Sequence, residues 1–157
     1  MPAAPVRAPA LWSIAAGALA ATIDIAYAIT WAVVHGSTPQ RLLQAVASGW
    51  QGKAAFEGGW ASAALGLASH YAILLVAAAL FLGASRRLPW LRLHAIPAGL
   101  LYGLAIFLFM NFVVLPLSAI PFHMRYSVVS TGGDLASHLV GVGLSISLLT
   151  RRAFTLP

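Results

Sequence analysis

The sequence GGWASAALGLASHYAILLVAAALFLGAS, residues 58–85, decides the fold of this chain. It contains no Asp, Glu, Lys or Arg, and about 20 such residues rising ~1.5 Å each cross the hydrocarbon core of a bilayer. One ionisable side chain, His70, lies near its middle. The stretch therefore predicts a membrane-spanning helix with a single titratable group inside the membrane.

The composition of the chain indicates that most of its surface faces lipid. Of 157 residues, 61% are hydrophobic and 8% are charged, whereas a soluble domain has about 25% charged residues. The net charge of +6 would suit nucleic acid, but the basic residues stand between and beyond the apolar runs, where they orient membrane helices. We therefore expect the lipid bilayer as partner and no nucleic acid.

Three more apolar runs complete a predicted all-α, polytopic membrane protein with a single domain over residues 1–157. The four spans are predicted at residues 10–34, 58–84, 96–118 and 134–150. The first run is longer than the roughly 7–15-residue core of a signal peptide, so a retained helix is favoured over a cleaved leader. Cysteine is absent, which excludes disulfides and thiolate metal sites.

A shorter helix is predicted between the first two spans, over residues 39–50. Thr38 followed by Pro39 is typical of a helix N-cap and first turn. Apolar residues recur at helical spacing from Leu42 to Trp50, and polar residues occupy the other side. The segment is too short to span, so it is predicted to lie in the membrane interface or to pack over the mouth of the bundle.

The placement of basic residues predicts the orientation. With four spans, both termini and the central loop share one side of the membrane. Six basic residues fall on that side: Arg7, Arg86, Arg87, Arg92, Arg151 and Arg152. Three fall on the other: Arg41, Lys53 and Arg125. Because loops rich in Lys and Arg stay in the cytoplasm, both termini are expected there.

Polar residues inside the predicted spans are the candidates for a ligand or proton site, because such groups are costly in a membrane and are often functional. The candidates are Asp24, His70, Asn111, Asp134 and His138. Counted from the outer helix ends at ~1.5 Å per residue, Asp24 and His70 lie about 15–16 Å deep, Asn111 about 10 Å and His138 about 7 Å. This predicts a polar layer that opens toward the outer face.

Asp24 and His70 form the predicted central pair. A carboxylate in mid-membrane should face inward and find a partner, and His70 lies at a matching depth. Two interpretations remain open: a structural hydrogen bond that fixes helix register, and a site that handles a proton or a ligand. Ser62 and Gly66 precede His70 at four-residue steps, which favours close approach of a neighbouring helix.

The remaining candidates also have structural explanations. Asn111 precedes Pro116 by five residues, and the proline predicts a kink whose exposed backbone needs a partner. Asp134 and His138 are four residues apart and share a helix face. Asp134 follows Thr131 by three residues, so N-terminal capping would explain it.

No cofactor, metal or catalytic residue is expected. Bis-histidine haem needs two ligands at one level, and His70 and His138 are predicted to differ by about 9 Å of rise. No HExxH or comparable zinc spacing, phosphate-binding loop, nucleophile elbow or dinucleotide fingerprint occurs. GxxxG at Gly99 and Gly103 indicates helix packing.

The second half of the chain resembles the YagU-like family of small bacterial inner-membrane proteins. The resemblance rests on SHY at 69–71, a basic Pro-containing loop, AGLLYG at 98–103, Asn111 with Pro116, and SHLVGVGLSISLLTRR at 137–152. It implies four helices in a bacterial inner membrane and supplies no substrate, because the family's function is unassigned. Asn111 stands where that family would have a histidine.

The sequence thus predicts a non-enzymatic membrane protein with a polar site inside the helix bundle, which handles or senses a proton or a small solute. The alternative is a structural or assembly partner of another membrane protein, joined through small-residue helix faces. The sequence also leaves homo-oligomerisation as an alternative, because four helices rarely enclose a wide pore.

Overall fold

The computed structural model describes residues 8–122 and 127–155, and the described chain is helical without strands. Two spans are the uninterrupted helices α1 (Pro9–Val34) and α3 (Gly59–Arg87). The third consists of α5 (Ala95–Phe109), η2 (Met110–Val114) and α6 (Leu115–Leu117). The fourth consists of α7 (Val128–Ala136), η3 (Ser137–Leu144) and α8 (Ser145–Thr155). The short helices are α2 (Pro39–Gln51), η1 (Gly52–Phe56) and α4 (Pro89–Leu93).

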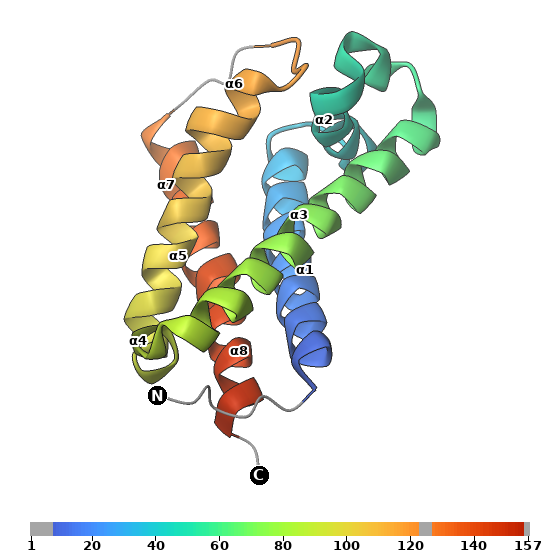
Figure 1. Ribbon diagram of the computed structural model, residues 1–157. Helices are drawn as coiled ribbons and strands as arrows, with labels where there is room; N and C mark the ends of the chain where they lie inside the picture. Colours follow the sequence, from blue (N-terminus) through green and yellow to red (C-terminus); the bar gives the residue numbers. More distant parts are fainter. Residues whose placement is uncertain (1–7, 123–126, 156–157) are drawn as a thin grey trace.

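Four of the described helical spans are long and apolar enough to cross a membrane, which confirms the predicted all-α, four-span fold. The helices stand roughly side by side, with α3 crossing the others obliquely (Figure 1). Helix α1 packs against α3 and the fourth span, and α5 packs against the other side of the fourth span. The chain is thus a multi-pass membrane protein in which the fourth span lies between α1 and α5.

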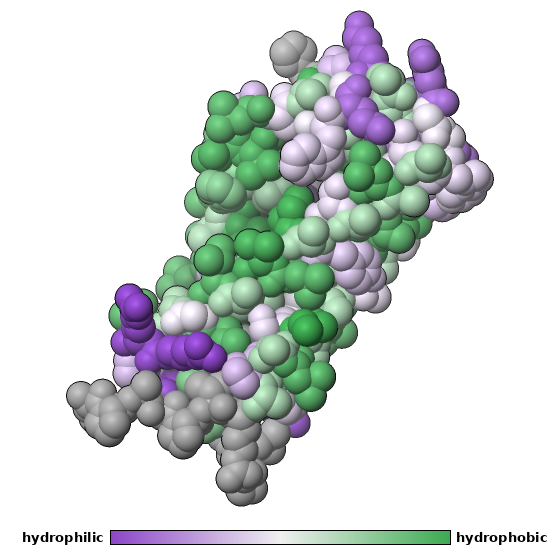
Figure 2. All heavy atoms as spheres, turned by 45° about the vertical axis from the view of Figure 1, so that its right-hand side comes forward, coloured by the Kyte–Doolittle hydropathy of each residue, from purple (hydrophilic) through white to green (hydrophobic). Residues whose placement is uncertain are grey.

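The two ends of the bundle differ from its middle. Helix α4, the start of α1 and the end of α8 lie at one end, and α2 and α6 lie at the other (Figure 1). The visible face of the molecule is hydrophilic at both ends and mainly hydrophobic between them (Figure 2). Exposed apolar side chains of the spans include Leu80, Leu101 and Phe112. This distribution matches a bundle whose sides face acyl chains.

Helix α2 occupies the segment predicted for the short amphipathic helix, but it buries a different face. Thr38 caps it by accepting a hydrogen bond from the Arg41 amide (3.1 Å). Leu43 and Gln44 are buried, whereas Trp50, expected on the apolar side, is 71% exposed. The reason is a close approach to α3: a Cβ at Gly66 would collide with the Leu43 carbonyl. Helix α2 therefore packs against α3 at the end of the bundle opposite α4.

The fourth span begins at Val128, six residues before the predicted start. Ser127 is its N-cap, and it forms a capping box with Ser130. The capping explanation for Asp134 is therefore wrong, because Asp134 lies almost two turns inside the helix. His138 is ten residues from the helix start, or about 15 Å deep. The predicted depth of about 7 Å was too shallow because the helix start was placed too late.

Two π-helical segments interrupt the third and fourth spans. Segment η2 (Met110–Val114) immediately precedes Pro116, where the missing proline N–H predicts a backbone irregularity. Segment η3 (Ser137–Leu144) has no proline to explain it, and it begins at the candidate site residues. Such π segments are rare and often occur at functional sites.

The apolar core fills the half of the bundle nearer α4. It is built of alanines on α1, α3 and α5 and of larger side chains on α3 and the fourth span. Its members are Ala16, Ala20, Ala21, Leu74, Ala77, Ala78, Phe81, Ala98, Val142 and Ile146. Asp24, His70, Asp134 and His138 precede or follow the core residues of their helices on the side toward α2 and α6, so the apolar core lies between them and the α4 end.

Candidate functional site

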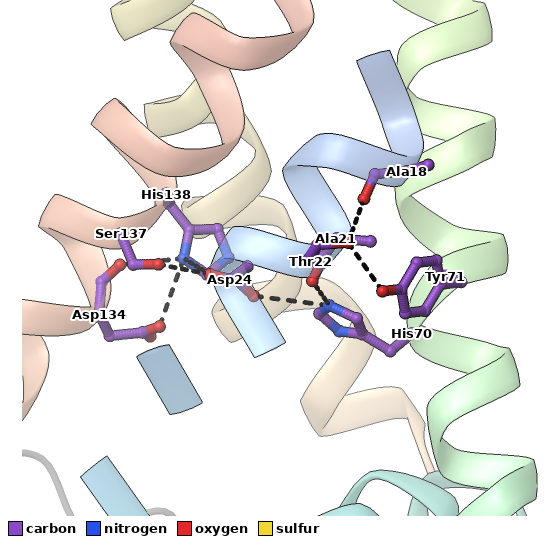
Figure 3. Close-up of polar contacts among 9 residues, drawn as sticks. All are labelled: Ala18, Ala21, Thr22, Asp24, His70, Tyr71, Asp134, Ser137 and His138. Atoms are coloured by element: carbon purple, nitrogen blue, oxygen red, sulfur yellow. Dashed lines mark hydrogen bonds and ion pairs between the residues drawn. The ribbon is translucent and has the colours of Figure 1, made fainter. Parts of the chain in front are cut away.

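Asp24 is the centre of a cluster of ionisable side chains inside the bundle (Figure 3). Its carboxylate lies between the imidazoles of His70, from α3, and His138, from η3. The Asp24 Oδ2–His70 Nε2 distance is 4.0 Å and the Asp24 Oδ1–His138 Nδ1 distance is 3.8 Å. All three side chains are nearly buried, at 12–13% exposure. We refer to Asp24, His70, Asp134 and His138 as the Asp–His cluster.

Asp134 completes the cluster on the fourth span. Its carboxylate Oδ1 is 3.3 Å from His138 Nδ1, as expected for residues four apart on one helix face. The side chain is 43% exposed, the most accessible of the four. The His138 Nδ1–H also donates to the main-chain carbonyl of Asp134 (3.0 Å). His138 thus faces two carboxylates and one carbonyl oxygen.

Hydrogen bonds from neighbouring groups hold Asp24 and His70 in place. The Ser137 hydroxyl donates to Asp24 Oδ1 (2.7 Å), which joins α1 to the fourth span. The His70 Nε2–H donates to the Ala21 carbonyl (3.1 Å), which joins α3 to α1. Distances of 3.8–4.0 Å are too long for hydrogen bonds. The Asp24–histidine contacts are therefore electrostatic, and Ser137 and Ala21 fix the geometry.

A second polar contact lies on the same level. The hydroxyls of Thr22 and Tyr71 are 2.8 Å apart (Figure 3), and Thr22 also donates to the Ala18 carbonyl (2.8 Å). Because the Thr22 hydrogen is used by Ala18, Tyr71 is the donor in this pair. The contact adds a third polar link between α1 and α3 and supports the position of His70.

The structure brings together four of the five predicted site residues. Asn111 is separate: it is buried in η2, and its amide donates to the Phe107 carbonyl on its own helix (3.0 Å). That bond goes to the preceding turn of the third span, four residues back. The Asp–His cluster therefore draws on α1, α3 and the fourth span, and not on the third span.

Sequence reasoning missed Ser137 and the proximity of His138 to Asp24. Ser137 precedes His138, and only the correct start of the fourth span places it beside Asp24. The predicted difference in level between His70 and His138 is also too large. Asp24, not an open gap, lies between the two imidazoles (Figure 3), so they do not face each other as haem ligands would.

The fourth span is held close to α5 at the level of the cluster. A Cβ at Gly103 would collide with the His138 carbonyl, and a Cβ at Gly143 would collide with the Gly99 carbonyl. The GxxxG glycines therefore pack this helix pair, as predicted. The Phe107 ring packs edge-on to the His138 imidazole at 5.6 Å. These contacts fix the His138 backbone and one side of its ring.

The cluster combines two carboxylates and two imidazoles in a membrane-spanning region. With both histidines neutral and both aspartates ionised it carries a charge of −2, which a bound cation would offset. Carboxylate oxygens and imidazole nitrogens exchange protons and also bind metal ions. Asp24, Asp134 and His138 each offer a ligand atom within 4.8 Å of the others. The arrangement is suited to binding a cation.

Comparison with family models, with curated proteins and with solved structures finds no match for this chain.

Proposed function

We propose that this protein is a bacterial inner-membrane protein, with both termini in the cytoplasm, whose Asp–His cluster binds a proton or a small cationic solute. In this proposal the chain belongs with the YagU-like proteins and is not an enzyme. Asp24 is the central group. His70 and His138 flank it, and Asp134 is the most accessible member of the cluster, toward the outer face.

The convergence of three spans on Asp24 is the observation that carries the proposal. A carboxylate in mid-membrane opposes insertion by about 2.5–3.5 kcal/mol. A structural hydrogen bond alone would need only one partner, yet Asp24 faces His70, Ser137 and His138 from two other spans. Ionisable groups that gather in this way inside membrane bundles commonly mark ion or solute pathways.

The charge distribution supports the proposed orientation. Arg86, Arg87 and Arg92 lie on or beside α4, at the end of the bundle that also holds the end of α8. Arg41 and Lys53 lie at the opposite end, on α2 and η1. The positive-inside rule favours the α4 end in the cytoplasm, so the Asp–His cluster lies in the outer half of the membrane.

An assembly role is the alternative, with another membrane protein or a second copy of this chain as partner. It requires small-residue faces that remain available for a neighbouring helix. The tight glycine positions are used within the chain: Gly66 against α2, Gly17 against α3, and Gly99 and Gly103 against the fourth span. The polar site is therefore the better supported function.

Reconstitution tests the proposal. The purified protein is placed in liposomes that contain a pH-sensitive dye, and an ion gradient is applied. Wild type is expected to change the internal pH, and Asp24→Asn and His70→Gln are expected to reduce the rate at least tenfold. His35→Gln is the control, because His35 is exposed at the end of α1 and should leave the rate unchanged.

Equal rates in wild type, Asp24→Asn and empty liposomes would reject proton movement through the cluster. Stoichiometric co-purification of another membrane protein, unaffected by Asp24→Asn, would favour the assembly role.

A further inference from the structure

We propose that the Asp–His cluster binds one divalent first-row transition-metal ion, with Asp24, Asp134 and His138 as its protein ligands. The inference rests on the proposed function, because it names the class of solute that the site takes. The proposed ligands come from two separate segments, and neither segment alone has the ligand spacing of a known metal-binding motif.

The three ligands come from two helices that the fold holds together. Asp134 and His138 share one face of the fourth span, and Asp24 approaches them from α1. Their ligand atoms lie within 4.8 Å of one another, with His138 Nδ1 at 3.3 Å from Asp134 Oδ1 and 3.8 Å from Asp24 Oδ1. Ligand bonds of ~2.1 Å in a tetrahedral site place ligand atoms about 3.4 Å apart. No pair of ligand atoms therefore has to close by more than about 1.4 Å.

The donor set selects the class of metal. Two carboxylates and an imidazole suit Zn²⁺, Mn²⁺, Fe²⁺ or Co²⁺, whereas Mg²⁺ and Ca²⁺ prefer oxygen ligands alone. Soft Cu⁺ prefers thiolate or thioether sulfur, and the chain has no cysteine. Three protein ligands leave at least one position for water or a further ligand, which is typical of exchangeable sites and not of closed structural ones.

Charge balance favours a divalent ion. When both are ionised, Asp24 and Asp134 carry −2 together, and Asp24 is only 13% exposed. An uncompensated buried carboxylate is costly. A divalent ion cancels both charges in one step, whereas a single proton cancels only one of them.

Neighbouring groups are placed to orient the ligands. The Ser137 hydroxyl donates to Asp24 Oδ1, and His70 stands 4.0 Å from Asp24 Oδ2. Such outer contacts commonly fix ligand orientation and tune affinity. His138 binds as neutral imidazole. Metal binding at Nδ1 selects the tautomer with its hydrogen on Nε2 and replaces the Nδ1–H bond to the Asp134 carbonyl.

Cobalt binding tests the inference directly. The full chain, without a histidine tag, is purified in detergent, stripped with a chelator and titrated with CoCl₂ while visible absorption is recorded. Wild type is expected to bind one equivalent, with a ligand-field spectrum that ZnCl₂ abolishes. Asp24→Asn and His138→Gln are expected to weaken binding at least tenfold. His94→Gln, which alters an exposed histidine near α4, is the matched control.

Asp134→Asn separates loss of ligation from loss of folding, because this side chain is the most exposed ligand. It should keep wild-type helicity and elution volume but lose cobalt affinity. No cobalt spectrum in folded wild type, or binding that all three ligand variants retain, would overturn the inference. If cobalt does not bind but liposome flux still requires Asp24, only the metal assignment fails. If neither occurs, the proposed function fails as well.

Discussion

Asp24 illustrates how a membrane protein accommodates a carboxylate that lipid alone would reject. The side chain receives a hydrogen bond from Ser137 and lies near two imidazoles. His70 comes from α3, and Ser137 and His138 come from the fourth span, so the position of Asp24 depends on the packing of these two spans against α1. A substitution at a partner of Asp24 should therefore lower the stability of the whole protein, even where it leaves the helix propensity of its own segment unchanged.

Ser137→Ala is expected to destabilise the protein modestly. It removes the hydroxyl that joins the fourth span to Asp24, and hydrogen bonds between membrane helices contribute about 0.6 kcal/mol on average and at most about 1.7 kcal/mol. The free energy of unfolding is measured by SDS titration of the detergent-solubilised protein. Its decrease on mutation should lie within that range.

Thr30→Val is the control for Ser137→Ala. Its hydroxyl donates to the Ala26 carbonyl of its own helix (2.7 Å). The free energy of unfolding should hardly change. An equal loss for both variants would show that the Ser137 hydrogen bond to Asp24 contributes nothing specific.

The pairing of Asp24 with His70 could be predicted from depth alone, because both helices were bounded well enough to count residues from their ends. The role of Ser137 could not. A serine in an apolar helix can equally bond to the preceding turn, as Ser69 does with the Leu65 carbonyl. Only the rotation of the fourth span decides between the two, and no local pattern gives that rotation.

Glycines at helix crossings set the distance between the spans. Gly103 faces the His138 backbone, so the approach of α5 fixes the position of His138. Gly83, in α3, has open space where a side chain would be. The two positions therefore separate a packing effect from a helix-propensity effect.

Gly103→Ala is expected to lower the free energy of unfolding by about 1–3 kcal/mol, because the added methyl group forces α5 away from the fourth span. Gly83→Ala should leave stability unchanged or raise it by up to about 1 kcal/mol, as alanine favours helix over glycine. SDS titration measures both. A loss at Gly83 equal to that at Gly103 would contradict the packing explanation.

The boundaries of the fourth span show why the cluster was only partly foreseen. Thr131, Gly132 and Gly133 favour a loop by composition, yet they lie inside α7. Ser127 caps the helix through Ser130, and packing of the span between α1 and α5 overrides the weak local preference. The error of six residues moved His138 by about 9 Å in predicted depth.

The molecule as a whole is organised as an apolar half and a polar half across the membrane. The core from Ala16 to Ile146 closes the half near α4, and α2 covers the half that contains the cluster. Hydropathy and charge spacing were sufficient to predict the four spans. They also predicted that α4, the start of α1 and the end of α8 lie at the same end of the bundle. The packing face of α2 was not predictable, because it depends on the exposed backbone of α3 at Gly66.

Single-cysteine labelling tests the orientation, and the absence of native cysteine makes the readout clean. Ser37 lies in the exposed connection before α2, and Leu88, before α4, is 57% exposed. A membrane-impermeant maleimide is expected to label Ser37→Cys in spheroplasts, and Leu88→Cys only after permeabilisation. The reverse pattern would place the Asp–His cluster in the cytoplasmic half of the membrane.

The π segment η3 has a consequence for the line of residues down the fourth span. Asp134, His138, Val142, Ile146 and Thr150 recur at steps of four, and the last three are fully buried. In a regular α-helix each step of four overshoots a full circle by about 40°, so the line would wind away from α1. The wider π turns of η3 reduce this drift between His138 and Val142. Converting η3 into regular α-helix would turn the ionisable half of the span relative to its apolar half. The conformation of this stretch is therefore as constrained as its composition.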